Sequence, residues 1–263
     1  MRICSQTANI HASATTDSET TSQALFGERV KVLTVDNHWS HIELHTDGYS
    51  GFVENHHLVN DIAHSTHRVI NKLTPLFDKP DIKSPVKQLA PLASELTLHK
   101  CDNNQFMRTN QQRYVWKQHT RPIDCRSDGQ LVNTALSLFF GSPYLWGGRS
   151  PLGLDCSALV QLAALLHGWR LPRDSSDQVA LFRSSNRSTK SDQSTLPLGT
   201  VRKVDYAQRQ TDDLVYWPGH VALVLDQESV VHATAHSLQC CIERLDQVEE
   251  RAGKPESIWR LIR

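Results

Sequence analysis

The sequence predicts an α+β domain over residues 125–263 that is preceded by small all-β units. Helical spacing of apolar residues dominates the first half of the predicted domain, and short β-branched runs follow it. Helices followed by strands that can pair antiparallel are typical of an α+β domain. Before residue 62 the chain holds only short alternating runs separated by turn signals, which favours a small all-β unit.

Length and composition limit the function. The chain has 263 residues, more than one small domain needs, and a hydrophobic fraction of 39% supports folded cores. No apolar run is long enough to span a membrane. The formal net charge is +0, so nucleic-acid binding has no electrostatic support. Residues 1–11 lack the apolar segment of a signal peptide, so we expect a cytoplasmic protein.

The cysteines do not form a recognisable framework. The six are Cys4, Cys101, Cys125, Cys156, Cys240 and Cys241. Their spacing fits neither a set of disulfides nor a zinc ribbon, and the neighbours Cys240 and Cys241 would point to opposite faces of a strand. We therefore expect reduced thiols and no bound metal.

Cys156 is the strongest candidate for a nucleophile. It follows a loop rich in glycine over residues 144–154, and the helical pattern begins directly after Asp155, a favoured N-cap residue. At that position the helix dipole and the unpaired N–H groups are expected to favour the thiolate. A cysteine in a helix is more often a core residue. The cap position, the glycine-rich approach and the histidines downstream favour the nucleophile here.

Two histidines can serve this cysteine. His220 begins one apolar run, His232 ends the next, and a turn at 226–229 separates the runs. Antiparallel pairing of the two strands would bring both rings to one end of a sheet. A Cys–His pair with a third group that orients the base is the arrangement that nucleophilic catalysis needs. His236 could lie on the same strand face as His232 or on the surface, and no glutamate completes an H-E-x-x-H metal motif with them.

At this point four motifs together resemble a known family. They are Y-L-W-G-G-R-S-P-L-G-L-D-C-S, L-P-R-D-S-S-D-Q, D-L-V-Y-W-P-G-H-V-A-L and V-V-H-A-T-A-H-S, within residues 130–263. Their order and spacing resemble the NlpC family of papain-like cysteine peptidases. The closer resemblance is to the γ-D-glutamyl-L-diamino acid endopeptidases, which carry bacterial SH3-like barrels ahead of the peptidase. Ala158 and Asp212 depart from the family pattern, because glycine is usual at both positions.

The resemblance implies three domains. Residues 1–62 would form one SH3-like barrel, residues 63–124 a second, and residues 125–263 a papain-like peptidase. The runs at 30–35, 38–44 and 49–53 are the predicted strands of the first barrel, with Trp39 and Phe52 filling it. From the residues alone, 63–124 indicates only short strands, so the second barrel depends on the resemblance.

Within the third domain the pattern predicts three helices and then a sheet. The first helix lies between Ser127 and Gly141, the second begins near Cys156, and the third begins at Asp174 or Ser175. The polar tract 183–195 is expected to be a surface loop. Strands at 241–245 and 257–262 are expected to close the sheet.

The predicted chemistry is hydrolysis of an amide. Cys156 would attack the carbonyl, His220 would protonate the leaving amine, and His232 would hold the far nitrogen of His220. The backbone N–H of Cys156 would face the oxyanion, as would Tyr144 by resemblance.

The resemblance also implies how substrate is held. Asp155 would bind the free α-amino group of a murein peptide with help from Tyr49, and Ser157 and Ser175 would line the same cleft. The implied function is an endopeptidase that cuts after γ-D-glutamate in peptides with a free L-alanine, in cell-wall recycling, without a cofactor. A non-catalytic muropeptide-binding protein and a papain-like acyltransferase are the alternatives.

Overall fold

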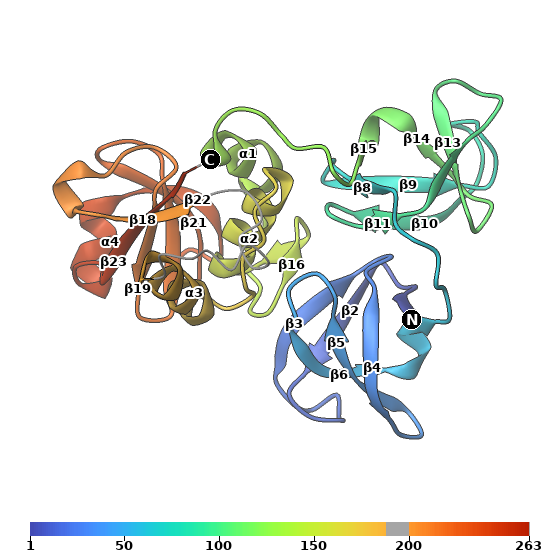
Figure 1. Ribbon diagram of the computed structural model, residues 1–263, viewed down its shortest axis with the longest axis horizontal. Helices are drawn as coiled ribbons and strands as arrows, with labels where there is room; N and C mark the ends of the chain where they lie inside the picture. Colours follow the sequence, from blue (N-terminus) through green and yellow to red (C-terminus); the bar gives the residue numbers. More distant parts are fainter. Residues whose placement is uncertain (188–199, 263) are drawn as a thin grey trace. The chain divides into compact units, whose positions relative to one another are not determined.

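The computed structural model describes residues 1–187 and 200–262 (Figure 1). The chain divides into two compact units. Unit 1 comprises residues 1–125 and 149–151, and unit 2 comprises residues 126–148 and 152–263. Unit 1 thus holds both predicted barrels, and unit 2 holds most of the predicted peptidase domain.

The first part of unit 1 is a small barrel-like sheet. Five antiparallel strands pair in the order β3-β2-β6-β5-β4, and β1 pairs with β7. The elements are β1 (Arg2–Ile3), β2 (Thr7–His11), β3 (Thr20–Leu25), β4 (Val30–Val35), β5 (Trp39–Leu44), β6 (Ser50–Glu54), the 3-10 helix η1 (Asn55–His57) and β7 (Leu58–Val59). The three predicted strands correspond to β4, β5 and β6. The core is aliphatic, with Ile10, Ile42 and Val53 fully buried. Trp39 and Phe52 do not fill it, because both are half-buried. Trp39 meets the ring of His11 edge to face, and Phe52 stacks on His41.

The second part of unit 1 repeats this plan with its own core. Its strands form two sheets, ordered β10-β9-β14-β13-β12 and β11-β8-β15. The elements are β8 (His67–Val69), β9 (Leu73–Phe77), β10 (Val86–Pro91), β11 (Glu95–Leu96), β12 (Leu98–Lys100), β13 (Phe106–Thr109), β14 (Tyr114–Trp116), the 3-10 helix η2 (Lys117–His119) and β15 (Thr120–Pro122). Leu76, Ala90 and Val115 are fully buried between these strands. The predicted second set of short strands is therefore confirmed.

Residues 149–151 belong to unit 1 although they come from the loop before Cys156. Strand β16 (Arg149–Ser150) places the Arg149 guanidinium 3.0 Å from both carboxylate oxygens of Glu28. Arg149 also donates to the backbone oxygen of Gln23 at 2.8 Å, and its side chain is fully buried. This buried ion pair was not predicted from the sequence.

Unit 2 is an α+β domain. Six antiparallel strands pair in the order β18-β23-β19-β20-β21-β22, and helices α1 and α2 pack against β20 and β21 (Figure 1). The elements are α1 (Leu131–Phe139), β17 (Gly153–Leu154), α2 (Cys156–Leu166), α3 (Ser175–Arg187), β18 (Thr200–Val204), the 3-10 helix η3 (Tyr206–Gln208), β19 (Leu214–Trp217), β20 (His220–Val224), β21 (Ser229–Thr234), β22 (Gln239–Arg244), α4 (Leu245–Ala252) and β23 (Ser257–Ile262).

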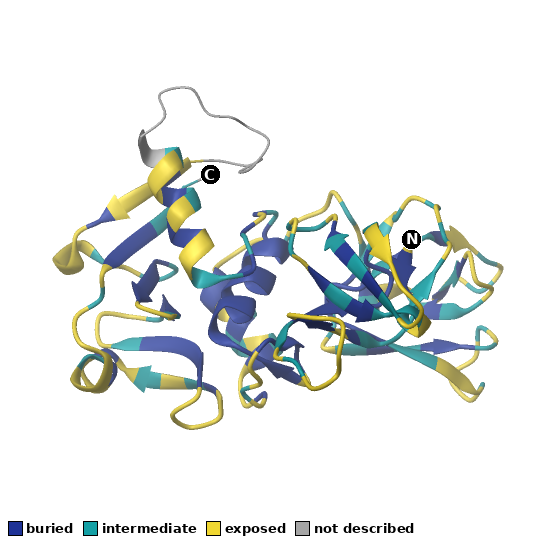
Figure 2. Cartoon of the chain, turned by 90° about the horizontal axis from the view of Figure 1, so that it is seen from below, coloured by how far each residue is buried: buried dark blue, intermediate teal, exposed yellow. Residues whose placement is uncertain are grey.

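Helix α2 is the buried centre of unit 2. Its eleven residues are all buried, and they form the dark blue helix of Figure 2. Asp155 begins the helix as predicted, accepting a hydrogen bond from the Ala158 N–H at 2.9 Å. The helix ends at His167, and Gly168 follows with φ +87°, a conformation that favours glycine. A helix buried on every side fixes its first residue firmly.

Several sequence predictions for this region were wrong in detail. Leu245 begins α4 rather than ending a strand, because Leu245 and Val248 bury one face of a helix that Gly253 closes. Strand β23 lies between β18 and β19 instead of closing the sheet. Residues 183–187 continue α3, and the remainder of the tract to 195 lies outside the described residues. Asp212 has φ +75°, a backbone conformation that favours the glycine implied there by the family resemblance.

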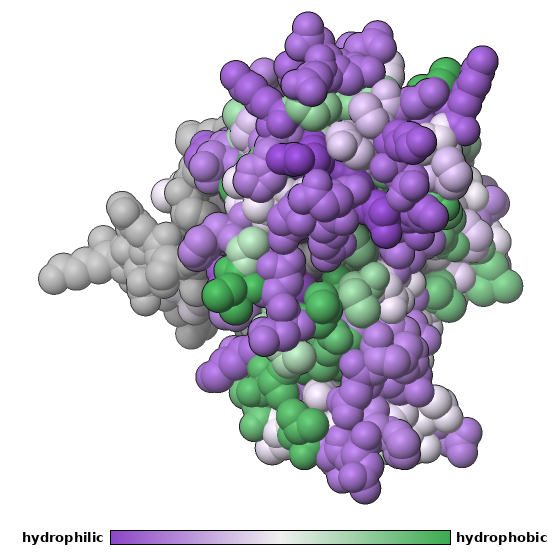
Figure 3. All heavy atoms as spheres, turned by 90° about the vertical axis from the view of Figure 1, so that its right-hand side faces the viewer, coloured by the Kyte–Doolittle hydropathy of each residue, from purple (hydrophilic) through white to green (hydrophobic). Residues whose placement is uncertain are grey.

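The surface is mainly polar, as the face in Figure 3 shows, with hydrophobic residues in patches. In the described part of the chain, no helix is both long and apolar enough to cross a membrane.

Candidate active site

The first turn of α2 places Cys156 beside the start of β20. Its sulfur lies 4.0 Å from the carbonyl oxygen of Gly219, and the backbone N–H of Val221 acts on it as a hydrogen-bond donor. Gly219 and Val221 flank His220 in the chain. The thiol therefore lies beside the backbone at the start of β20, the strand that His220 begins.

The two predicted histidines lie side by side. His220 Nε2 is 2.9 Å from His232 Nδ1, and the ring centres are 5.0 Å apart. Adjacent strands β20 and β21 hold them at one end of the sheet. His220 is left with Nδ1 as the nitrogen that can serve the thiol.

The chain of hydrogen bonds continues beyond the predicted residues. His232 Nε2 lies 3.1 Å from a carboxylate oxygen of Glu243, and Arg251 binds both oxygens of that carboxylate at 2.6 and 2.8 Å. Sequence analysis missed both residues. Cys241 is the partner of His232 in the β21–β22 register. Glu243 lies two residues further along β22, so its side chain points to the same face of the sheet as His232, and strand alternation could have predicted the contact.

The ionisation of the thiol differs from the prediction. Burial raises the pKa of Cys156 to about 11, and the negative charge of Asp155 contributes. The residue that begins the helix thus adds a charge that opposes the thiolate, while the Arg173 charge and the backbone N–H groups of Ser157 and Val221 favour it. Burial also lowers the pKa of His220 to about 4. Burial and the charge of Asp155 thus oppose the thiolate that the helix start was expected to favour.

Asp155 has a second role beside capping. Arg173 donates to its two oxygens at 3.0 and 2.6 Å, and the Gly147 N–H donates at 3.1 Å. Ser157 donates to Asp155 at 3.1 Å and accepts from Arg173 at 2.9 Å. The carboxylate is therefore charge-balanced within unit 2, and this network ties the glycine-rich loop to the helix start.

The other predicted residues lie in different places. Burial, with the charges of Cys156 and Asp155, raises the pKa of Tyr144 to about 12, which places its phenol near the thiol. Ser175 is the first residue of α3 and is half-buried. Tyr49 lies in unit 1, where its hydroxyl is 3.5 Å from the Thr21 oxygen, and its role in substrate binding stays a prediction. His236 follows the end of β21 and is exposed, which is the surface alternative.

Two further polar residues are linked by hydrogen bonds to the first turn of α2, which carries Cys156. The fully buried Tyr216 donates to Gln178 Oε1 at 2.9 Å, and Gln178 donates in turn to the Ser157 backbone oxygen at 3.3 Å. The Cys156 charge helps to raise the pKa of Tyr216, so the phenol lies close to the sulfur. Both residues belong to the motifs that carry the family resemblance, L-P-R-D-S-S-D-Q and D-L-V-Y-W-P-G-H-V-A-L, but no role was predicted for either.

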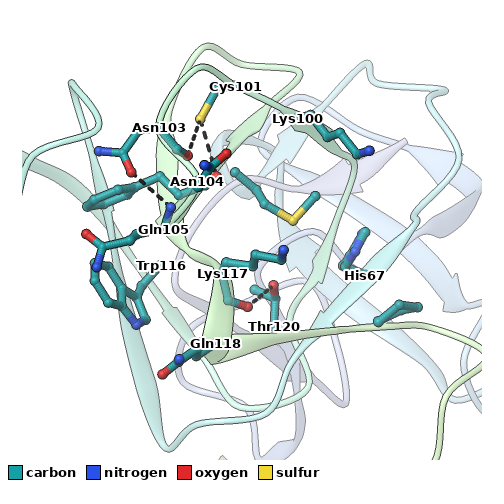
Figure 4. Close-up of a pocket in the computed structure, with 13 residues that line it drawn as sticks. His67, Lys100, Cys101, Asn103, Asn104, Gln105, Trp116, Lys117, Gln118 and Thr120 are labelled. Carbon is teal, nitrogen blue, oxygen red and sulfur yellow. Dashed lines mark hydrogen bonds between the residues drawn. The ribbon is translucent and has the colours of Figure 1, made fainter.

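Other clusters lie in unit 1. Among the described residues, Glu54, His56 and His57 form the one group of three whose metal-binding atoms lie within 4.8 Å of one another, and Ser5 hydrogen bonds to His57 at 2.6 Å. A cavity of about 710 Å³ lies among the strands of the second part of unit 1, and Figure 4 shows its lining. The lining combines polar residues such as Lys100 and Lys117 with the apolar Met107 and Trp116.

Comparison with known proteins identifies both parts of the chain. Residues 141–252 match the model of the NlpC/P60 family, and these residues include the thiol and both histidines. The chain carries an NlpC/P60 domain. Residues 10–58 match the bacterial dipeptidyl-peptidase SH3 domain, so the all-β start of the chain is an SH3 domain. The resemblance inferred from the four motifs is confirmed.

Several known proteins are similar to this chain along most of its length. The chain is 25% identical over 91% of its length to dipeptidyl-peptidase 6 of Lysinibacillus sphaericus, covering 89% of that protein. It is 27% identical over 81% of its length to the gamma-D-glutamyl-L-lysine dipeptidyl-peptidase of Bacillus cereus, covering 66% of it. The crystal structure of an NlpC/P60 family protein from Bacillus cereus superposes with a TM-score of 0.78 over 100% of this chain and 99% of that one, at 19% identity. This last likeness concerns the fold alone.

Proposed function

We propose that the protein is a cysteine endopeptidase that hydrolyses the γ-D-glutamyl–diamino acid bond of murein peptides. The observation that carries the proposal is the alignment of Cys156, His220 and His232 within an NlpC/P60 domain. Two relatives named gamma-D-glutamyl-L-lysine dipeptidyl-peptidase support the substrate class. The free, N-terminal L-alanine, the cytoplasmic location and the recycling role belong to the same proposal.

The mechanism follows from the ionisation of the site. His220 Nδ1 takes the proton of the Cys156 thiol, and the sulfur attacks the carbonyl. The imidazolium then protonates the leaving amine, and water hydrolyses the thioester with His220 as the base. The backbone N–H at the start of α2 and the Tyr144 hydroxyl face the developing oxyanion. One such donor lowers the activation barrier by about 3 kcal/mol.

The test is incubation with L-Ala-γ-D-Glu-L-Lys and with the diaminopimelate analogue. We expect L-Ala-D-Glu and the free diamino acid as products, and no turnover by a folded Cys156→Ala variant. Turnover by that variant contradicts the nucleophile. Binding of the tripeptide without turnover by the wild type instead supports the alternative of a muropeptide-binding protein.

Recognition of the free amino group needs its own measurement. A charge-assisted hydrogen bond from the α-ammonium group to Asp155 contributes about 1.5–3 kcal/mol, or roughly ten- to a hundredfold in kcat/KM. The N-acetylated tripeptide should therefore be cleaved at least tenfold more slowly than the free one. Equal kcat/KM values for the two peptides would remove Asp155 from substrate recognition.

A further inference from the structure

We infer that Glu243, anchored by Arg251, is a positioning residue that sets the tautomers of both active-site histidines. This inference rests on the proposed peptidase function, since it assigns a role within the same site. The four side chains come from β20, β21, β22 and α4, and all lie within unit 2.

The geometry forms one unbroken line. Arg251 Nη1 and Nη2 donate to Glu243 Oε1 and Oε2 at 2.6 and 2.8 Å. The same Oε2 lies 3.1 Å from His232 Nε2, and His232 Nδ1 lies 2.9 Å from His220 Nε2. The His232 side chain is fully buried and that of Glu243 is 14% exposed, so water competes little for these bonds.

The Glu243 carboxylate fixes which atom donates in each of these hydrogen bonds. An ionised carboxylate is purely an acceptor, so His232 Nε2 must carry the proton that it donates to Glu243. A neutral His232 then has a bare Nδ1, which accepts from Nε2–H of His220. His220 Nδ1 is left without a proton, which is the state that can take the proton of the Cys156 thiol. Without Glu243, His232 could carry its proton on Nδ1 instead, and His220 would then be turned to the unproductive tautomer.

Glu243 is held in its ionised form. The hydrogen bonds from Arg251 are the largest cause of a lowered pKa of Glu243, and the charges of Arg251 and His232 add to the effect against burial. The carboxylate therefore stays ionised near neutral pH. Arg251 fixes the position of Glu243 as well as its charge, because a bidentate guanidinium–carboxylate contact restricts both partners.

The rival interpretation is that Glu243 and Arg251 only fasten α4 to β22. A fastening role predicts a loss of stability with unchanged chemistry in the molecules that remain folded. A positioning role predicts a loss of kcat at unchanged KM, together with a change in the protonated nitrogen of each histidine.

The experiment compares Glu243→Leu, Glu243→Gln and the control Glu250→Gln in the full chain. Glu250 is exposed and lies next to Arg251, so the control removes a similar charge without touching His232. Glu243→Leu should lower kcat about 10- to 100-fold, since Glu243 is one link farther from the reacting atoms than a residue that orients the base directly. Glu243→Gln keeps an acceptor oxygen and should retain more activity than Glu243→Leu. Wild-type kcat in Glu243→Leu overturns the inference.

A second readout separates this inference from the peptidase proposal. In ¹⁵N-histidine spectra of the wild type, His220 and His232 should both show protonated Nε2 and bare Nδ1. Glu243→Leu should shift both toward protonated Nδ1, and Glu250→Gln should not. These spectra need no turnover, so they test the tautomers even if the tripeptide is not a substrate. Unchanged histidine signals in Glu243→Leu overturn the positioning role.

If Glu243→Leu fails to fold, Arg251→Leu takes its place. Arg251 is 33% exposed at the surface, so its replacement leaves the buried histidines in contact with Glu243 while freeing the carboxylate to move. Mixed tautomers and a several-fold lower kcat support the inference. A wild-type spectrum with wild-type kcat contradicts it.

Discussion

Arg173 offers a direct test of how the nucleophile is held. Its guanidinium donates to both oxygens of Asp155 at 3.0 and 2.6 Å. It also donates to the Ser157 hydroxyl at 2.9 Å and to the Gly148 backbone oxygen at 3.4 Å. The side chain of Arg173 is 1% exposed and that of Asp155 is 10% exposed. Replacing Arg173 by methionine preserves most of the volume and removes the charge. Asp155 would then be a buried carboxylate without a counter-charge.

The expected cost follows from that burial. Removing one partner of a buried ion pair costs about 3–5 kcal/mol, because the remaining charge stays desolvated. The backbone N–H groups of Gly147 and Ala158 still donate to Asp155, which places the expected loss toward the lower end of this range. Removing both charges in Asp155→Asn/Arg173→Met should cost less than the sum of the two single changes, by about 1–3 kcal/mol.

Urea unfolding followed by circular dichroism measures these free energies. Arg170→Met is the matched control, since Arg170 is exposed three residues away, and its change should stay within about 0.5 kcal/mol of the wild type. Two results would refute the reasoning. The first is an Arg173→Met variant as stable as the control, and the second is strict additivity in the double variant.

Three further predictions concern other residues. His232→Asn should keep more activity than His232→Ala, because an amide oxygen can also accept from His220; equal loss in both would exclude His232 as the orienting residue. Burial lowers the pKa of His220 to about 4, so on acidification the unfolded chain is protonated at this residue before the folded chain, and stability present above about pH 6.5 is lost as the pH falls toward 4. A pKa difference of about 2.5 corresponds to about 3 kcal/mol of unfolding free energy. The His220→Gln variant should therefore lose less unfolding free energy than the wild type between pH 7 and pH 4.5, by a similar amount. Arg149→Ala should destabilise unit 1 by about 3–5 kcal/mol through the unpaired Glu28, measured by urea unfolding, and an unchanged midpoint would contradict this.

The sequence predicts the site well where one local signal and one strand pair are enough. Asp155 before an apolar helical pattern locates the start of α2, and two β-branched runs joined by a short turn bring His220 and His232 together. Both inferences use contacts within a few residues or between neighbouring strands. Such contacts depend on capping and alternation, which the sequence displays directly.

The site residues that were not predicted from the sequence, Glu243 and Arg251, depend on strand register and on where a helix begins. Glu243 reaches His232 only because β22 pairs with β21 in one register, and Arg251 reaches Glu243 only because α4 begins at Leu245. The run Cys241–Leu245 favours a strand by composition, and four of the eight residues of α4 are charged. Burial of Leu245 and Val248 against the sheet decides the helix, and that tertiary contact is not visible in the local pattern.

For the Cys156 thiol, the position at a helix start predicts a lowered pKa, whereas burial raises it. The position at the start of α2 favours the thiolate through the helix dipole, an effect of about 0.3–1 kcal/mol at an exposed helix end and up to about 2 kcal/mol when partly buried. Raising the pKa of Cys156 from 9.0 to about 11 corresponds to roughly 3 kcal/mol in the opposite direction. Burial thus outweighs the dipole, and Asp155, the residue that makes the helix begin there, adds to the burial effect. Because burial opposes the thiolate, the reactivity of the sulfur depends on its base, and the tautomer of His220 becomes important for the site.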